Sequence, residues 1–300
     1  MGKETAMEKQ GRKWGDRRDA KLVHTPGLNT IMGYLWPKRT DCECYLYDEI
    51  DATELVRWLA EKNASHPEYK TTLFHCMVTG LARMVMERPL LNRFIQGYRT
   101  YEHNEITISF VAKQKFADGA EESLMVLKPG PEDTLDTISH RIIGDVKRVR
   151  KAGNNKSGID DLLDKFAAIP MPILALVIRI IRWLDFWGIN PKVLTEGDPH
   201  YTSILTSNLG SIGCPAVYHH LNNYGTNSVM ITIGTLKKKK VLMEDGSEEI
   251  RDIIDIGATV DERIADGFYF ARSLKLIKYI FANPELLERP LGQESGYEYR

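Results

Sequence analysis

The sequence predicts an α+β domain in which a mixed β-sheet is covered by helices. The order of the expected elements favours this class over a doubly wound parallel sheet. Segments with strand-like and helix-like patterns both recur along the chain, and they do not alternate strictly as strand, helix and strand. In addition, 43% of the 300 residues are hydrophobic and 27% are charged, which is typical of a soluble protein with a sizeable core.

The first half of the chain contains short strands and amphipathic helices. We expect one strand at 44–47 and another at 106–110, and in the second segment apolar side chains alternate with polar ones. Asp51 can cap a helix that carries Glu54 three residues later. Apolar residues recur at helical spacing over 72–87 and 135–149, so each segment is predicted to be a helix with one buried face.

The second half contains further strands and a final helix. A loop is expected at 151–158, where Gly and Asn gather, and strands are expected near 202–208, 228–236 and 250–260. A last helix should cover 270–281. Pro284 should stop it, because proline cannot continue a helix.

These elements suggest one domain with short extensions. We expect a flexible basic arm at 1–20, a domain at 21–290 that carries an apolar insertion at about 160–195, and a tail at 291–300. The arm lacks the apolar segment of a secretion signal. None of the four cysteines has C-x-x-C spacing, which favours reduced thiols and a cytoplasmic location, with peripheral membrane contact left open.

The charge balance argues against a nucleic-acid partner. The chain has 40 Lys and Arg residues against 41 Asp and Glu residues, a formal net charge of -1. We find no basic stripe interleaved with aromatic residues. No metal site is expected either, because the adjacent His219 and His220 lack third and fourth ligands at a recognisable spacing.

Two motifs carry a family resemblance. Residues 260–267 read V-D-E-R-I-A-D-G, and residues 206–213 read T-S-N-L-G-S-I-G. They resemble the D-H-R-x-x-D-G and S-N-[LI]-G-x-x-G motifs of the catalytic domain of 2-oxoacid dehydrogenase dihydrolipoyl acyltransferases. Weaker similarity covers 47–55 and 88–92. The resemblance implies a two-layer, chloramphenicol acetyltransferase-like fold and a homotrimer with active sites between subunits.

The resemblance also implies a function. We expect transfer of an acyl group between CoA, or another thiol, and an acceptor that the sequence does not identify. CoA would be a co-substrate, and no covalently bound cofactor is expected. Fewer than 30 residues precede the matched region, so we expect no lipoyl domain in this chain. The alternative is a non-catalytic trimeric scaffold or acyl/CoA-binding module, with membrane association as an option.

Glu262 stands where the family has its catalytic histidine. A thiol titrates near 8.5, a free His near 6.5 and a free Glu near 4.3, so proton transfer to Glu is uphill by about 5–6 kcal/mol, against about 3 kcal/mol for His. Glu262 could therefore act as a base only in an apolar pocket that raises its pKa. The alternative is a surface carboxylate or one paired with Arg263.

The other candidate residues also have two interpretations each. Ser207 would donate to the oxyanion, which is worth about 3 kcal/mol, or bond to backbone as a strand hydroxyl. Asp266 is a catalytic candidate as the Asp of the family motif, or it would cap the following helix, with Arg263 holding it in place of basic residues that the family has near 30–34. His219 or His220 would be a surface residue, or would supply the missing imidazole.

The apolar insertion, strongest at 169–187, is too short to span a bilayer. It could be a buried or trimer-facing helix, a lid over an acyl chain, or an interfacial membrane helix with Arg179 and Arg182 at the headgroups. The run from Lys237 to Lys240 is interpreted as a solvated strand end, with CoA phosphates or anionic lipid as alternative partners.

Overall fold

The structure is a computed structural model, and it describes residues 15–65, 69–113, 122–152 and 168–299. Most of the loop predicted at 151–158, and the first part of the insertion, lie outside these residues.

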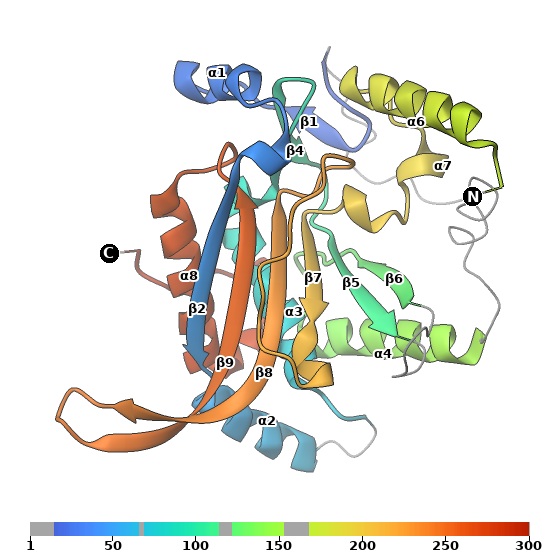
Figure 1. Ribbon diagram of the computed structural model, residues 1–300. Coiled ribbons are helices and arrows are strands. Elements are labelled where there is room, and N and C mark those ends of the chain that lie inside the picture. The colour runs from blue at the N-terminus through green and yellow to red at the C-terminus, as the bar shows by residue number, and fades with distance from the viewer. Residues whose placement is uncertain (1–14, 66–68, 114–121, 153–167, 300) are drawn as a thin grey trace.

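A mixed sheet forms the centre of the described chain (Figure 1). Its strands lie in the order β2-β9-β8-β7-β5-β6. Strand β7 is parallel to both of its neighbours, and the other pairs are antiparallel. The strands are β2 (Glu43–Asp51), β5 (Ile108–Lys113), β6 (Glu122–Leu127), β7 (Ile204–Asn208), β8 (Val229–Leu242) and β9 (Glu248–Asp261).

Helices cover one face of this sheet, behind the strands in Figure 1. They are α2 (Thr53–Ser65), α3 (Leu73–Glu87), α4 (Leu135–Ala152) and α8 (Gly267–Ala282). Successive strand residues point to opposite faces, so Ile254, Ile256 and Ala258 of β9 face the helices and join the main core. Helix α3 lies at the centre of this layer, and the residues from His75 to Val85 are buried throughout.

A second, smaller sheet and three helices lie at one end of the main sheet, at the top of Figure 1. The strand order is β1-β4-β3. The strands are β1 (Ala20–Leu22), β3 (Arg93–Gln96) and β4 (Arg99–His103), and the helices are α1 (Gly27–Leu35), α6 (Met171–Phe186) and α7 (Lys192–Thr195). Short 3-10 helices are η1 (Arg39–Asp41), η2 (Pro89–Asn92), η3 (Pro199–Tyr201), η4 (Leu209–Ile212) and η5 (Pro284–Glu288).

The α+β class is confirmed, and so are most elements. The helix predicted at 72–87 begins after Thr72, whose side chain and that of His75 form a reciprocal capping box. The last helix ends at Ala282, before Pro284 as expected. Strands β8 and β9 are longer than predicted and form a hairpin that extends beyond the sheet (Figure 1). Its exposed lysines, Lys237 to Lys240, pair with acidic side chains, so a solvated strand end is the correct interpretation.

Both predicted extensions need correction. Residues 15–20, the described part of the basic arm, pack into the domain: Arg17 is buried, and Ala20 begins a paired strand. The described part of the tail also packs against the domain. Leu291 and Ser295 are buried, and Arg83 of α3 donates to the backbone oxygen of Gln293 at 2.6 Å. Hydrogen bonds to residues far away in the chain hold both segments in place, and no local sequence pattern predicts such partners.

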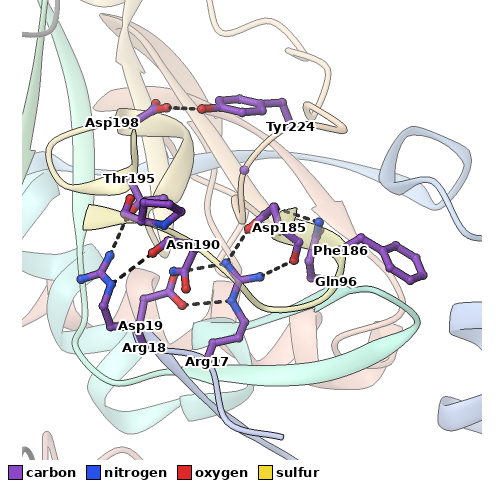
Figure 2. Close-up of polar contacts among 12 residues, drawn as sticks. Arg17, Arg18, Asp19, Gln96, Asp185, Phe186, Asn190, Thr195, Asp198 and Tyr224 are labelled. Atoms are coloured by element: carbon purple, nitrogen blue, oxygen red, sulfur yellow. Dashed lines mark hydrogen bonds and ion pairs between the residues drawn. The ribbon is translucent and has the colours of Figure 1, made fainter. Parts of the chain in front are cut away.

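The described part of the insertion forms α6, whose apolar side chains remain largely exposed. Met171 is 84% exposed and Trp183 is 59% exposed. The end of α6 is anchored by Asp185, which accepts hydrogen bonds from Arg17 and Gln96 (Figure 2). The helix is therefore not core within one chain. Among the described helices, none combines the length and apolar character that crossing a membrane requires.

Candidate functional site

An extended segment at 214–222 crosses the sheet on the face opposite the helices. Thr235 of β8 donates its N–H to the backbone oxygen of Cys214 at 3.1 Å, and Thr232 of β8 donates its hydroxyl to Val217. Farther along, the N–H of Leu221 donates to the carboxylate of Glu43 on β2 at 2.6 Å. The segment thus runs from β8 across β9 to β2.

Two glycines allow this segment to lie directly on the sheet. A Cβ on Gly234 of β8 would lie 2.5 Å from the backbone nitrogen of Ala216. A Cβ on Gly257 of β9 would lie 2.5 Å from the backbone oxygen of Val217. Any larger residue at either position would push the segment away from the sheet.

The segment carries His219 and His220, and both are exposed. Their rings lie 4.8 Å apart, and each Nδ1 contacts the backbone oxygen of the next residue, at 3.0 and 2.9 Å. The segment then reaches Glu43, which lies opposite Asp261 in the β2–β9 pairing. The histidine pair and Glu262 therefore lie at the same end of the sheet.

Glu262 follows directly after β9 and is solvent-exposed. Its backbone N–H donates to Cys42 at 3.0 Å. Arg263 does not pair with it, because Arg263 binds Asp261 through Nε at 2.8 Å and Nη2 at 2.6 Å. Within one chain, Glu262 thus lacks the apolar pocket that a carboxylate base requires, and the pairing with Arg263 that we considered is wrong.

Asp266 caps α8. Its carboxylate accepts the backbone N–H of Tyr269 at 2.8 Å, which confirms the predicted cap. The expected partnership of Asp266 with Arg263 is wrong, since the guanidinium of Arg263 is turned to Asp261 and to the backbone oxygen of Trp36. The free N–H groups at the start of α8 hold Asp266 without a basic partner.

Ser207 lies on β7, opposite Thr232 of β8, and is half-buried. Among the described residues, its hydroxyl has no hydrogen-bond partner, and the half-buried side chain remains open to water. Asn208 accepts the N–H of Ser211 and so shapes the following turn. Gly210 allows that turn to approach β8, since a Cβ there would lie 2.4 Å from the backbone oxygen of Gly234.

Ser207 and Glu262 do not converge within one chain. Ser207 lies opposite Thr232, and Thr232 lies opposite Gly257, five residues before Glu262. At a rise of about 3.3 Å per residue, five strand residues correspond to about 16 Å along the sheet. One reacting group could contact both side chains only if they came from different subunits.

A buried charge cluster beside Glu262 was not apparent from the sequence. Asp261 binds Arg263, and Arg39 lies near the same carboxylate, with Nε 3.7 Å from Oδ2. Arg39 also donates to the backbone of Asn222, 183 residues away. In the sequence, the sign of this cluster is the concentration of charge in the 261–263 motif. That motif does not identify Arg39 as a partner.

The C-terminal part of the chain matches a family model. Residues 191–288 match the model described as 2-oxoacid dehydrogenases acyltransferase (catalytic domain). The resemblance to the 2-oxoacid dehydrogenase acyltransferases is confirmed. The matched region contains both the Ser207 motif and the Glu262 motif of the acyltransferase pattern.

A curated acyltransferase relative extends this similarity. The lipoamide acyltransferase component of the branched-chain alpha-keto acid dehydrogenase complex of Bacillus subtilis is 22% identical over 240 residues. The match covers 77% of this chain and 45% of that protein, so the chain spans about half the length of its curated relative.

Solved acyltransferase structures share the fold. A probable dihydrolipoamide acetyltransferase from Listeria monocytogenes has a TM-score of 0.57 and 18% identity, covering 93% of this chain and 98% of that one. A dihydrolipoamide acetyltransferase of Azotobacter vinelandii has a TM-score of 0.59 and 14% identity, with coverages of 89% and 94%. The acyltransferase-like α+β fold predicted from the motifs is thereby confirmed.

Proposed function

We propose that the protein is an acyltransferase that moves an acyl group between CoA, or another thiol, and an acceptor, at sites between the subunits of a homotrimer. The match over residues 191–288 carries this proposal, because it includes both motifs that supply reactive groups. The relative from Bacillus subtilis is a lipoamide acyltransferase component, which supports acyl-thioester chemistry. Acyl-CoA is the co-substrate in this proposal, and no covalently bound cofactor takes part.

Ser207 is the oxyanion donor in this proposal. Its hydroxyl is free of partners among the described residues and lies on the sheet face without helices. A hydroxyl in that state can donate to a tetrahedral oxyanion without first breaking another bond. Because Ser207 and Glu262 lie about 16 Å apart along the sheet, a Glu262 base must reach Ser207 from a second subunit.

The base is Glu262 or one of the two histidines. Glu262 is exposed within one chain, so a second subunit would have to bury it before it could compete for a thiol proton. His219 and His220 lie at the same end of the sheet and bring an imidazole better suited to that task. Proton transfer to an imidazole of His219 or His220 is therefore less costly than proton transfer to Glu262.

The first test measures turnover of acyl-CoA with a small thiol acceptor. Ser207→Ala should lower kcat by roughly 10²–10³ with little change in KM, because the lost interaction forms only in the transition state. Ser211→Ala is a matched control, since Ser211 lies on the next turn and its hydroxyl already bonds to the backbone of Asn208. Equal rates in wild type and Ser207→Ala would remove the oxyanion role.

The second test identifies the base. If Glu262 acts directly, Glu262→Gln should abolish activity, because an amide does not accept the proton. If a histidine acts, His219→Asn or His220→Asn should be the lethal change, and Glu262→Gln should cost only part of the rate.

A non-catalytic trimeric scaffold, or an acyl/CoA-binding module, is the second candidate. The exposed carboxylate at the position of the catalytic histidine favours it. Absence of turnover in wild type, combined with no gain from Glu262→His, would support this candidate. Mass spectrometry of ligands retained during purification would then show whether acyl-CoA binds, and light scattering would show whether the protein is a trimer.

Cellular location is part of the proposal. We propose a cytoplasmic protein with peripheral membrane contact through 169–187, where α6 exposes Trp183 together with Arg179 and Arg182. Apolar and aromatic side chains beside arginines suit the boundary between lipid headgroups and acyl chains.

A further inference from the structure

A polar cavity of about 220 Å³ lies at the end of the sheet that carries α6. Its walls come mainly from η1, the β3–β4 hairpin, the end of α6 and the loop that contains Asn223 and Tyr224. Neither Ser207, Glu262 nor the histidine pair lines it. The cavity is thus separate from the groups proposed for acyl transfer, although Arg263, the neighbour of Glu262, forms part of its wall.

Cations dominate the charged lining of this cavity. Among the described lining residues they are Lys38, Arg39, Arg182 and Arg263, and Asp185 is the one carboxylate. Asp185 is paired with Arg17, whose Nη2 lies 2.8 Å from Oδ1 and which also binds Asp19, and Figure 2 shows this pair with Gln96 on the other oxygen. The cavity therefore keeps an excess of positive charge.

Arg39 is the buried cation whose bonding is incomplete. It is 3% exposed, and its two terminal nitrogens donate to backbone oxygens of Asn222, Ile95 and Gly225. Its Nε has no hydrogen-bond partner among the described residues. A buried guanidinium with incomplete bonding contributes positive charge to the cavity wall, which favours an anionic ligand.

The carboxylate behind Arg39 does not fully compensate its charge. Oδ2 of Asp261 lies 3.7 Å from Nε of Arg39, and both oxygens of Asp261 are held at 2.6–2.8 Å by Arg263. One carboxylate thus serves two guanidinium groups. Burial lowers the pKa of Arg39 to about 10, which agrees with a cation that lacks a full counter-charge.

Aromatic side chains complete the wall and connect it to α6. Tyr98, at the tip of the β3–β4 hairpin, has a φ of 63°, which residues other than glycine rarely adopt. Its ring stacks on Tyr34 at 4.9 Å and meets Phe186 of α6 edge-on at 5.1 Å. A Cβ on Gly97 would lie 2.1 Å from the backbone oxygen of Phe186. The hairpin is therefore built against α6, and the end of α6 forms part of the cavity wall.

We propose that this cavity binds a small oxyanion, the carboxylate or phosphate group of a compact molecule, with Arg39 and Arg182 as its charged ligands. Guanidinium groups present paired N–H donors that match carboxylate and phosphate oxygens. The volume lies below the roughly 300–1,000 Å³ of pockets for drug-sized ligands, which excludes a whole CoA molecule. This site does not depend on the proposed acyl transfer.

Isothermal titration calorimetry tests the proposal. Inorganic phosphate and succinate are titrated separately into the full chain, in a buffer without oxyanions and at matched ionic strength set with chloride. We expect saturable binding of at least one anion. Arg182→Gln should weaken it by about tenfold or more, because a hydrogen bond to a charged group is worth about 1.5–3 kcal/mol.

Arg179→Gln is the matched control. Arg179 lies one turn earlier on α6, is also exposed and does not line the cavity, so this variant should bind as wild type does. Binding of phosphate alone or of succinate alone would each support the site and identify its oxyanion. No saturable binding of either anion, or equal weakening in Arg179→Gln and Arg182→Gln, would overturn the proposal. Both arginines are exposed, so folding of the variants, checked by circular dichroism, should be preserved.

Discussion

Arg17 and Asp185 lie 168 residues apart in the chain and form a buried ion pair. The guanidinium of Arg17 donates to the carboxylate of Asp185 at 2.8 Å and to its backbone oxygen at 3.0 Å, and it also binds Asp19 (Figure 2). Burial alone would lower the pKa of Arg17, but the two carboxylates outweigh burial and raise it. This contact connects the N-terminal segment to the end of the insertion.

Removing Arg17 should destabilise the fold. Arg17→Met leaves two carboxylates without their cation, one of them buried, and breaking a buried pair in this way costs about 3–5 kcal/mol. Urea denaturation followed by circular dichroism measures the change. Arg57→Met is the control, because the Arg57–Glu54 pair is exposed and should contribute less than about 1 kcal/mol. Equal effects of the two substitutions would contradict the structural role of Arg17.

Gly257→Ala should displace the segment that carries the two histidines. The added Cβ meets the backbone oxygen of Val217 at 2.5 Å, and overpacking of this kind costs about 1–3 kcal/mol. Hydrogen exchange should become faster at 214–222. At Gly267 a Cβ has no neighbour within 4 Å, so Gly267→Ala should change stability by less than about 1 kcal/mol. Unchanged exchange in Gly257→Ala would show that the segment does not lie on β9.

Stability should fall as the pH drops from about 6.5 to about 4. Burial lowers the pKa of His75 to about 4, and its Nδ1 accepts the N–H of Thr72, which requires the neutral ring. An unfolded His titrates near 6.5, so below that pH the unfolded state binds a proton that the folded state does not bind. Stability is therefore complete above about pH 6.5 and is lost by up to about 1.4 kcal/mol per pH unit below it.

His75→Gln tests this dependence. Gln keeps an acceptor at the third helical position, where it suits a capping box, and it does not titrate. The slope of unfolding free energy against pH between 6.5 and 4 should decrease by up to about 1.4 kcal/mol per pH unit, which corresponds to one bound proton. His103, whose pKa burial also lowers to about 4, should account for part of the remaining slope. Identical slopes in wild type and His75→Gln would show that His75 does not contribute.

The apolar surface of α6 should bind lipid. Trp183 and Trp187 are 59% and 55% exposed, and burial of one large apolar side chain is worth about 1.5–3 kcal/mol. Replacing both by Ser should weaken co-sedimentation with anionic liposomes by at least about tenfold. Phe268→Ser, which changes an exposed side chain on α8, should leave co-sedimentation unchanged. Dissociation into monomers with unchanged lipid binding would instead assign α6 to a subunit interface.

The sequence by itself determined the elements whose signals are local. The helical spacing of apolar residues located α3 and α4, Pro284 marked the end of α8, and Asp266 was predicted to cap it. The motifs at 206–213 and 260–267 were sufficient to predict the family resemblance and the α+β fold. These signals are readable because spacing, capping and turn chemistry act between residues a few positions apart.

The tertiary structure alone decided which distant side chains meet. Arg17 with Asp185, and Arg39 with Asp261, pair across more than 160 residues, and neither pairing follows from a periodic pattern. The apolar insertion was compatible with a core helix, yet one chain leaves much of it exposed because the core is already filled by α2, α3, α4 and α8. Likewise, the strand register separates Ser207 from Glu262, because their place along the sheet depends on pairing rather than on their spacing in the sequence.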